Sequence, residues 1–201
     1  MNKEMNISEA TIISEYENEV VDDRRLFIDS DIDGDVVTTI VYQILRYNRL
    51  DKGLPVNERT PIIVYINTFG GNMTDGFALI DVIMNSKTPV YTVNIGMAYS
   101  AGFLVFISGH KRFSMEHASF LMHDGSLQIE STMSKLNDRI QFEMLQSHSK
   151  YEHYITKKTN ITHETYNQNL RREWYFYPEE GKDLGMVDYI VGIDCDIEEI
   201  L

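Results

Sequence analysis

Several features are scarce in this chain of 201 residues, and each absence narrows the classes to which it can belong. The sequence has a single cysteine, Cys195, so it cannot form a disulfide within the chain. The opening residues MNKEMNISEA lack the apolar stretch of a secretory signal, and together with the lone cysteine this predicts a cytoplasmic protein. The longest apolar run, Phe103 to Ile107, is far shorter than the ~20 residues that cross a bilayer, so we expect no membrane partner.

Positive charge is also in short supply. The chain has 18 lysines and arginines against 31 acidic residues, a net charge of −13. Nucleic-acid binding depends on basic side chains that neutralise phosphates, so nucleic acid is not an expected partner. The hydrophobic fraction of 43% is typical of a folded soluble protein, and the length suits one domain.

Short β-rich runs alternate with stretches whose apolar residues recur at helical spacing. This alternation predicts an α/β fold with a mainly parallel sheet, because parallel strands need crossover connections. We find no internal repeat and no low-complexity linker. The expected units are a strand over Arg24–Ile28 with a helix over Gly34–Tyr47, a strand over Pro61–Asn67 with a helix over Phe77–Asn85, and a strand over Pro89–Asn94 with an apolar segment that begins at Ser100.

Two of the expected strand ends are rich in glycine, and ligands of parallel sheets bind at such ends. Gly70 and Gly71 follow the second strand and would let a substrate carbonyl approach the backbone. Ser100 follows a third strand in the stretch NIGMAYSAG, where the free N–H groups of a helix start can stabilise an oxyanion. The alternative is that these glycines serve only tight turns and that Ser100 caps a helix.

A nucleophilic serine needs a base, and His123 is the histidine best placed to be one. It follows the apolar run Ala118–Met122 and precedes Asp124 and Gly125, at a further strand end. Histidine titrates near neutral pH and can accept the serine proton. The remaining histidines either lie on a long helical stretch or lack a second ligand at metal spacing, so no metal site is expected; they are His148 and His153 in the first group and His110, His117 and His163 in the second.

Four segments of the sequence resemble, in order and spacing, landmark segments of the ClpP serine peptidases. They are YINTFGGNMTDGFALIDVI, NIGMAYSAG, FLMHDG and RREWYFYPEEGKDLGMVD. The resemblance extends from Asp23 to Gly192. It implies a crotonase-like α/β fold with a protruding handle helix, in which residues 1–24 form an N-terminal axial segment and residues 25–201 one peptidase domain, with the handle near 126–160.

The resemblance also assigns roles to residues. Ser100 matches the nucleophile, His123 the base, and the backbone N–H groups of Gly71 and Ala101 the oxyanion hole. An alignment without gaps places Glu173 where the family usually carries the aspartate of the triad. A glutamate can also orient the histidine, although with a longer stem, and the alternative is an ordinary surface carboxylate.

Assembly and partners follow from the resemblance as well. The family forms two stacked seven-membered rings, and its members receive unfolded polypeptides from an AAA+ unfoldase that uses ATP, so no cofactor is expected in this chain. The expected handle helix carries an apolar stripe that would contact other subunits or, alternatively, the chain's own core. The stripe consists of Met133, Leu136, Ile140, Met144 and Tyr151.

We therefore expect an ATP-dependent, Clp-type serine endopeptidase. Two departures from the family pattern are visible: the acidic N-terminal segment does not match the family's axial loops, and Gly125 is the only glycine of the stretch DGSLQIEST. A catalytically weak structural subunit that assembles with a ClpP paralogue is the first alternative, favoured by Glu173. A crotonase-type acyl-CoA enzyme is the second, although the pair of Ser100 and His123 argues against it.

Overall fold

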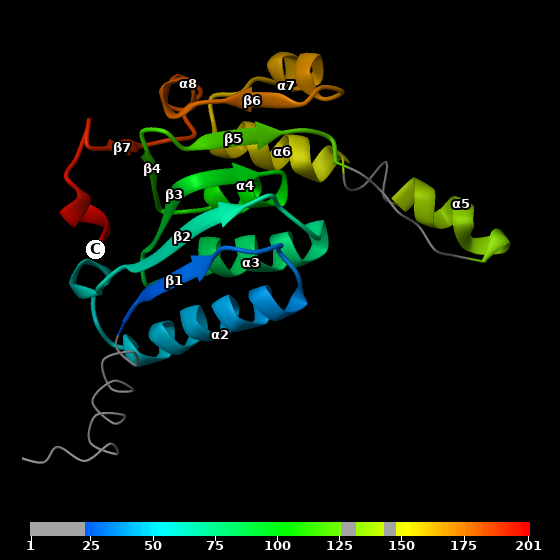
Figure 1. Cartoon of the computed structure of the whole chain (residues 1–201). Coiled ribbons are helices and arrows are strands. Elements are labelled where there is room, and N and C mark those ends of the chain that lie inside the picture. The colour runs from blue at the N-terminus through cyan, green and yellow to red at the C-terminus, as the bar shows by residue number, and fades with distance from the viewer. Residues whose placement is uncertain (1–22, 126–131, 143–147) are drawn as a thin grey trace, which may run out of the picture.

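The computed structural model describes residues 23–125, 132–142 and 148–201, in which strands and helices alternate along the chain (Figure 1). The strands are β1 (Arg25–Ile28), β2 (Ile62–Thr68), β3 (Val90–Tyr99), β4 (Lys111–Met115), β5 (Ser119–Met122), β6 (Trp174–Phe176) and β7 (Tyr189–Val191). The α-helices are α2 (Gly34–Leu50), α3 (Met73–Asn85), α4 (Ala101–Phe106), α5 (Met133–Gln141), α6 (His148–Lys158), α7 (His163–Asn169) and α8 (Pro178–Asp183), and two 3₁₀ helices are η1 (Val56–Glu58) and η3 (Ile197–Ile200).

A mainly parallel sheet organises these elements, which confirms the α/β class. Its main path is β1-β2-β3-β4-β7, and all neighbours on this path are parallel. β5 pairs in parallel with the second half of β3, and β6 adds to β5 in the antiparallel direction. The carboxyl ends of β2, β3 and β5 therefore meet at one edge of the sheet, where parallel sheets place their functional groups.

β3 is longer than the sequence pattern predicts. We expected it to end at Asn94, but it continues to Tyr99, and its first half pairs with β4 while its second half pairs with β5. The buried Asn94 side chain holds this branch point, since it donates to Ser119 O at 2.9 Å and accepts from Gly96 N at 3.2 Å. Gly96 therefore lies within a strand and not in a turn.

β2 is buried on both faces, as its continuous apolar run predicts. Ile62, Val64 and Ile66 belong to the larger core, which includes residues of α2, α3, α4 and α6. Ile63 and Tyr65 face the opposite side, where a smaller core includes Ile200 of η3. This two-sided burial makes β2 the inner strand beside β3 and fixes the position of the glycine loop that follows it.

The helices begin where their capping residues allow. Asn72 caps α3, because its side chain accepts hydrogen bonds from Thr74 N and Asp75 N. α3 therefore begins at Met73, one turn before the apolar pattern that started at Phe77. Within the described ranges, no helix is long and apolar enough to cross a membrane.

The expected handle falls on α5, on α6 and on residues between them that lie outside the described ranges. α5 ends at Gln141 and α6 begins at His148, while Met144 of the expected stripe lies outside the described residues, as do residues 1–22 of the expected axial segment. α5 stands away from the rest of the chain in Figure 1, and none of its residues is buried. Met133 is 90% exposed. The stripe on α5 therefore does not pack on the chain's own core.

The loop after β2 packs tightly against the end of β3. Gly70 has a φ angle of +113°, which favours glycine. A Cβ atom at this position would lie 2.8 Å from both Ser100 Cβ and Tyr99 O, and 3.2 Å from Ala101 N. The absence of a side chain at Gly70 is therefore what lets the glycine loop contact the turn at Ser100.

This contact predicts that Gly70→Ala destabilises the protein more than a matched substitution elsewhere. Gly53 is the control, because it also has a positive φ, +101°, but nothing lies within 4 Å of its Cβ position. Backbone strain alone should cost about 1–3 kcal/mol in either variant, and overpacking should cost Gly70→Ala about 1–3 kcal/mol more. Chemical denaturation measures both; equal losses would show that the two loops do not need this close contact.

Candidate active site

Ser100 occupies a sharp turn between β3 and α4. Its backbone has φ 53° and ψ −121°, and it is the one non-glycine residue with positive φ in the described ranges. Its N–H donates to Leu121 O of β5 at 2.9 Å, and its side chain makes no capping hydrogen bond to α4. The structure thus does not support the helix-cap alternative. A serine in a strained strand-to-helix turn at the carboxyl end of a parallel strand is the arrangement that presents a nucleophilic hydroxyl.

The glycine loop, Gly70 and Gly71, lies beside this turn, and hydrogen bonds that involve Ile32, Ser30 and Thr68 hold it in place. Gly70 O accepts from Ile32 N, and Asn72 N donates to Ile32 O, both at 2.7 Å. Thr68 Oγ1 accepts from Gly70 N at 3.1 Å and donates to Ser30 O at 2.6 Å. These bonds use the groups on either side of Gly71, and the Gly71 N–H has no acceptor in the described ranges.

A second donor comes from the start of α4. The first helical bonds run from Phe103 N and Leu104 N to Ser100 O, so the N–H of Ala101 precedes them and has no helical acceptor. Because the Cβ position of Gly70 is 3.2 Å from Ala101 N, this N–H lies next to the glycine loop. The structure therefore places the N–H of Ala101 and the loop that contains Gly71 next to each other, beside Ser100.

His123 directly follows β5, the strand that receives the Ser100 N–H through Leu121. Its ring is half-buried, and its Nε2 atom is buried without a hydrogen-bond partner in the described part of the chain. Leaving a buried polar atom without a partner costs about 1–3 kcal/mol, so such an atom needs a functional or structural reason. An imidazole nitrogen of this kind can accept a proton from a nucleophile that approaches it.

Glu173 comes just before β6, the strand that pairs with β5 just before His123. Met122 of β5 pairs with Trp174 of β6, and one more step along this antiparallel register brings Glu173 opposite His123. In the described structure, however, no hydrogen bond joins Glu173 to His123, or His123 to Ser100. The site thus has its three expected groups on adjacent segments, but their side chains are not in contact.

Tyr175 is the partner that Glu173 does have. Its hydroxyl donates to Glu173 Oε2 at 3.0 Å, and this bond to the carboxylate raises the pKa of the Tyr175 hydroxyl above its ordinary value. Our sequence reasoning missed this tyrosine. The period of two in an extended segment could have revealed it, because residues 173 and 175 lie on one face of the segment that leads into β6.

A row of aromatic side chains extends from this pair. Tyr175 meets Tyr99 edge to face with ring centroids 5.7 Å apart, and Tyr99 meets Phe69 in the same way at 6.0 Å. Phe69 is 70% exposed and Tyr175 is 52% exposed. Because Phe69 adjoins Gly70 and Tyr99 adjoins Ser100, this row offers an apolar surface for substrate side chains next to the candidate nucleophile.

The described residues contain no group of three histidine, cysteine or acidic side chains that could hold a metal ion.

A comparison with known protein families matches residues 8–194 to the family model described as Clp protease. The matched range covers the glycine loop, the turn at Ser100, His123 and Glu173. The chain belongs to the Clp protease family and is therefore related to peptidases of this type.

Proposed function

We propose that this chain is a serine endopeptidase that cleaves unfolded polypeptides through an acyl-enzyme. The observation that carries the proposal is the position of Ser100, in a positive-φ turn beside the glycine loop and next to the strand that leads to His123. In the described ranges the backbone N–H groups of Gly71 and Ala101 have no acceptor. Membership in the Clp protease family supports the same chemistry.

In this mechanism, Ser100 Oγ attacks the scissile carbonyl carbon while its proton passes to His123 Nε2. The N–H groups of Gly71 and Ala101 stabilise the oxyanion that forms on the carbonyl oxygen. The carbon–nitrogen bond then breaks, and the amine leaves with the proton from His123. Water, activated by the same nitrogen, hydrolyses the ester and restores the Ser100 hydroxyl.

The separation of the side chains in the free protein is compatible with this sequence of steps. Catalytic hydrogen bonds are often long in free enzymes and shorten when substrate binds. The backbone groups that fix the site are already engaged, since Ser100 N is bound to β5 and Gly70 to Thr68. The proposal then requires the side chains of Ser100, His123 and Glu173 to rotate into contact when substrate binds.

Substitution Ser100→Ala tests the proposal, and we expect it to abolish hydrolysis of an unfolded protein and of a fluorogenic peptide. Only a hydroxyl is lost, so stability should stay within about 0.5 kcal/mol of the wild-type value. The matched control is Ser119→Ala, which removes the hydroxyl that pairs with Tyr99 on the neighbouring strand and should retain most of the activity. Full activity in Ser100→Ala would refute the mechanism.

Glu173 orients His123 in the proposed triad, and Tyr175 holds Glu173. A glutamate side chain has one more rotatable bond than the aspartate that the family usually carries, so it is harder to hold in one orientation. The Tyr175 hydroxyl restrains it by donating a hydrogen bond to Oε2. The other oxygen, Oε1, is left to accept a hydrogen bond from the Nδ1–H group of His123, which follows the neighbouring strand β5. Tyr175 is therefore a positioning residue in this proposal and not a group that touches the reacting atoms.

Tyr175→Phe should lower kcat about five- to tenfold and leave KM nearly unchanged, because the aromatic ring and the substrate contacts remain. Tyr177→Phe is the control, since Tyr177 is 64% exposed and makes no hydrogen bond through its hydroxyl in the described structure. Peptide hydrolysis at several substrate concentrations separates the two constants. A rise of kcat in Tyr175→Phe would contradict this role and show that the hydroxyl keeps Glu173 away from His123.

The same Glu173 contact favours one second candidate, a catalytically weak subunit that serves the assembly of an active paralogue. In the described structure Glu173 binds Tyr175 and not His123, as expected of a triad that is not in working order. The two candidates differ in a simple way. A weak subunit would show little hydrolysis by itself, and Ser100→Ala would change nothing.

We further propose that the chain assembles into seven-membered rings, two of which stack, and that an ATP-driven AAA+ unfoldase supplies its substrates. The exposed apolar residues of α5 and the family membership support this assembly. Met133 at 90% and Phe142 at 57% exposure are unusual for a single chain in water, and burial against other subunits would remove them from solvent.

Charged residues in this stripe should prevent assembly. We expect Leu136→Asp with Ile140→Asp to convert a particle of seven or fourteen copies into single chains of 23.3 kDa, as measured by light scattering. Two acidic substitutions at exposed polar positions of the same helix, Asn137→Asp with Gln141→Glu, add the same charge, are the control and should leave the mass unchanged. An unaltered particle in the first variant, or a wild-type protein that is monomeric at all concentrations, would contradict the assembly.

A further inference from the structure

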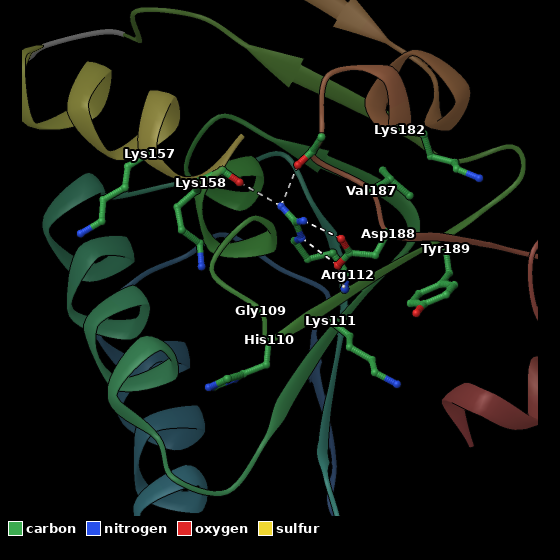
Figure 2. A pocket seen from close by; sticks show the side chains of 11 residues that line it. Gly109, His110, Lys111, Arg112, Lys157, Lys158, Lys182, Val187, Asp188 and Tyr189 are labelled. Atoms are coloured by element: carbon green, nitrogen blue, oxygen red, sulfur yellow. Dashed lines mark hydrogen bonds and ion pairs between the residues drawn. The ribbon is translucent and has the colours of Figure 1, made fainter. Parts of the chain in front are cut away.

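A second hollow lies at the opposite edge of the sheet from Ser100. Tyr91, near the start of β3, pairs with Lys111 at the start of β4, whereas Ser100 follows the far end of β3. The cleft is therefore a strand's length away from the candidate active site. Its volume of 770 Å³ lies within the range of ~300–1,000 Å³ that is typical of ligand sites. Its lining consists of Gly109, His110, Lys111, Arg112, Lys157, Lys158, Lys182, Gly185, Val187, Asp188 and Tyr189 (Figure 2).

This cleft is positively charged although the chain is acidic. Its lining has five lysine and arginine side chains and one carboxylate, which gives a net charge of +4. The whole chain has only 18 such basic residues and a net charge of −13. More than a quarter of the chain's basic side chains thus gather in one hollow, where low-dielectric walls strengthen their potential.

Arg112 is fixed at the centre of the cleft, as Figure 2 shows. Its Nε and Nη2 atoms donate to the two Asp188 oxygens at 2.9 and 2.6 Å. Its Nη1 atom donates to Lys158 O at 3.1 Å and to Gly185 O at 2.9 Å. The planar guanidinium is therefore already occupied by a carboxylate, and it forms a rigid wall.

Two of the lysines have partners of their own. Lys182 Nζ forms an ion pair with Asp194 Oδ1 at 2.6 Å. The ammonium of Lys111 lies 5.1 Å from the ring centroid of Tyr91 and 5.8 Å from that of Tyr189. These contacts compensate much of the positive charge of Lys182 and Lys111.

Lys157 and Lys158, at the end of α6, differ from them. Neither has a carboxylate partner in the described ranges, and Lys158 Nζ has only a distant carbonyl, Ser108 O at 3.5 Å. Burial lowers the pKa of Lys158, as do the positive charges of Arg112 and Lys157, while Asp188 acts in the opposite direction. The two ammonium groups therefore carry positive charge that an anion could compensate.

We propose that this cleft binds an oligophosphate group through Lys157 and Lys158. A lysine acts as a point charge that suits phosphate oxygens, whereas the paired arginine has no free fork for a carboxylate. Because Asp194 already neutralises Lys182, a net charge of about +3 remains in the cleft. One phosphate brings only about −1.5 to −2 at neutral pH, so neutralising this charge takes two of them. The volume of 770 Å³ also exceeds what a single phosphate needs.

Isothermal titration calorimetry of the full chain with sodium tripolyphosphate tests this site. We expect one saturable site per chain in low-salt buffer, weakened by added salt. Lys157→Gln with Lys158→Gln should weaken tripolyphosphate binding at least about tenfold. Lys157→Arg with Lys158→Arg keeps both charges and should retain the binding. The control is Lys52→Gln with Lys87→Gln, which removes the same charge at a second cleft between α2 and α3. The affinity of this variant for tripolyphosphate should stay within about twofold of the wild-type value.

Two further titrations identify the source and the class of the anion. ATP carries three phosphates on a nucleoside; tighter binding of ATP than of tripolyphosphate would identify a nucleotide, and equal or weaker binding a free phosphate chain, both in support of the proposal. A pentaglutamate peptide that binds as tightly as tripolyphosphate would overturn the oligophosphate class. An absence of saturable heat, or an equal loss in the Lys52 and Lys87 control, would overturn the site itself.

Discussion

The hydrogen bond from Ser100 N to Leu121 O, at 2.9 Å, is the contact on which the arrangement of the candidate active site depends. It is the last bond of the parallel pairing between β3 and β5, whose register ends at Tyr99 and Leu121, and it lies at the residue where the backbone turns into α4. The bond ties the turn with φ 53° at Ser100 to β5, the strand that His123 directly follows. The glycine loop then completes the arrangement, since Gly70 can lie against Ser100 only because it lacks a Cβ atom.

The sequence was sufficient to predict those parts of the fold that rest on continuous patterns. The apolar run of β2 predicted a strand buried on both faces, and glycines next to Ser100 predicted a functional edge. The length of β3 was not predictable, because Gly96 inside a strand has the appearance of a turn. The strand continues through the pairing of its second half with β5, and Gly96 is a glycine in a strand because a Cβ atom there would lie 2.6 Å from Asn67 Oδ1. The family comparison confirms the resemblance seen in the sequence.

The candidate site was predictable in its residue types but not in its contacts. Ser100, His123 and Glu173 come from three separate segments, and sequence spacing does not tell whether their side chains meet. In the structure the Glu173 carboxylate binds Tyr175, a contact across one face of a short strand that no motif signals. The cationic cleft was hidden for a similar reason, since its basic residues come from β4, the end of α6 and α8, which are separated in the sequence.

The two edges of the sheet thus have opposite characters. The carboxyl edge presents Ser100 among glycines and exposed aromatic rings, and the amino edge presents positive charge. The claim at the centre of this account is that Ser100 is a nucleophile. Its most direct test is reaction of the wild-type chain with a fluorophosphonate probe, followed by mass spectrometry of the proteolytic fragments. The account predicts a single adduct on Ser100, whereas an adduct on another residue, or none, would contradict it.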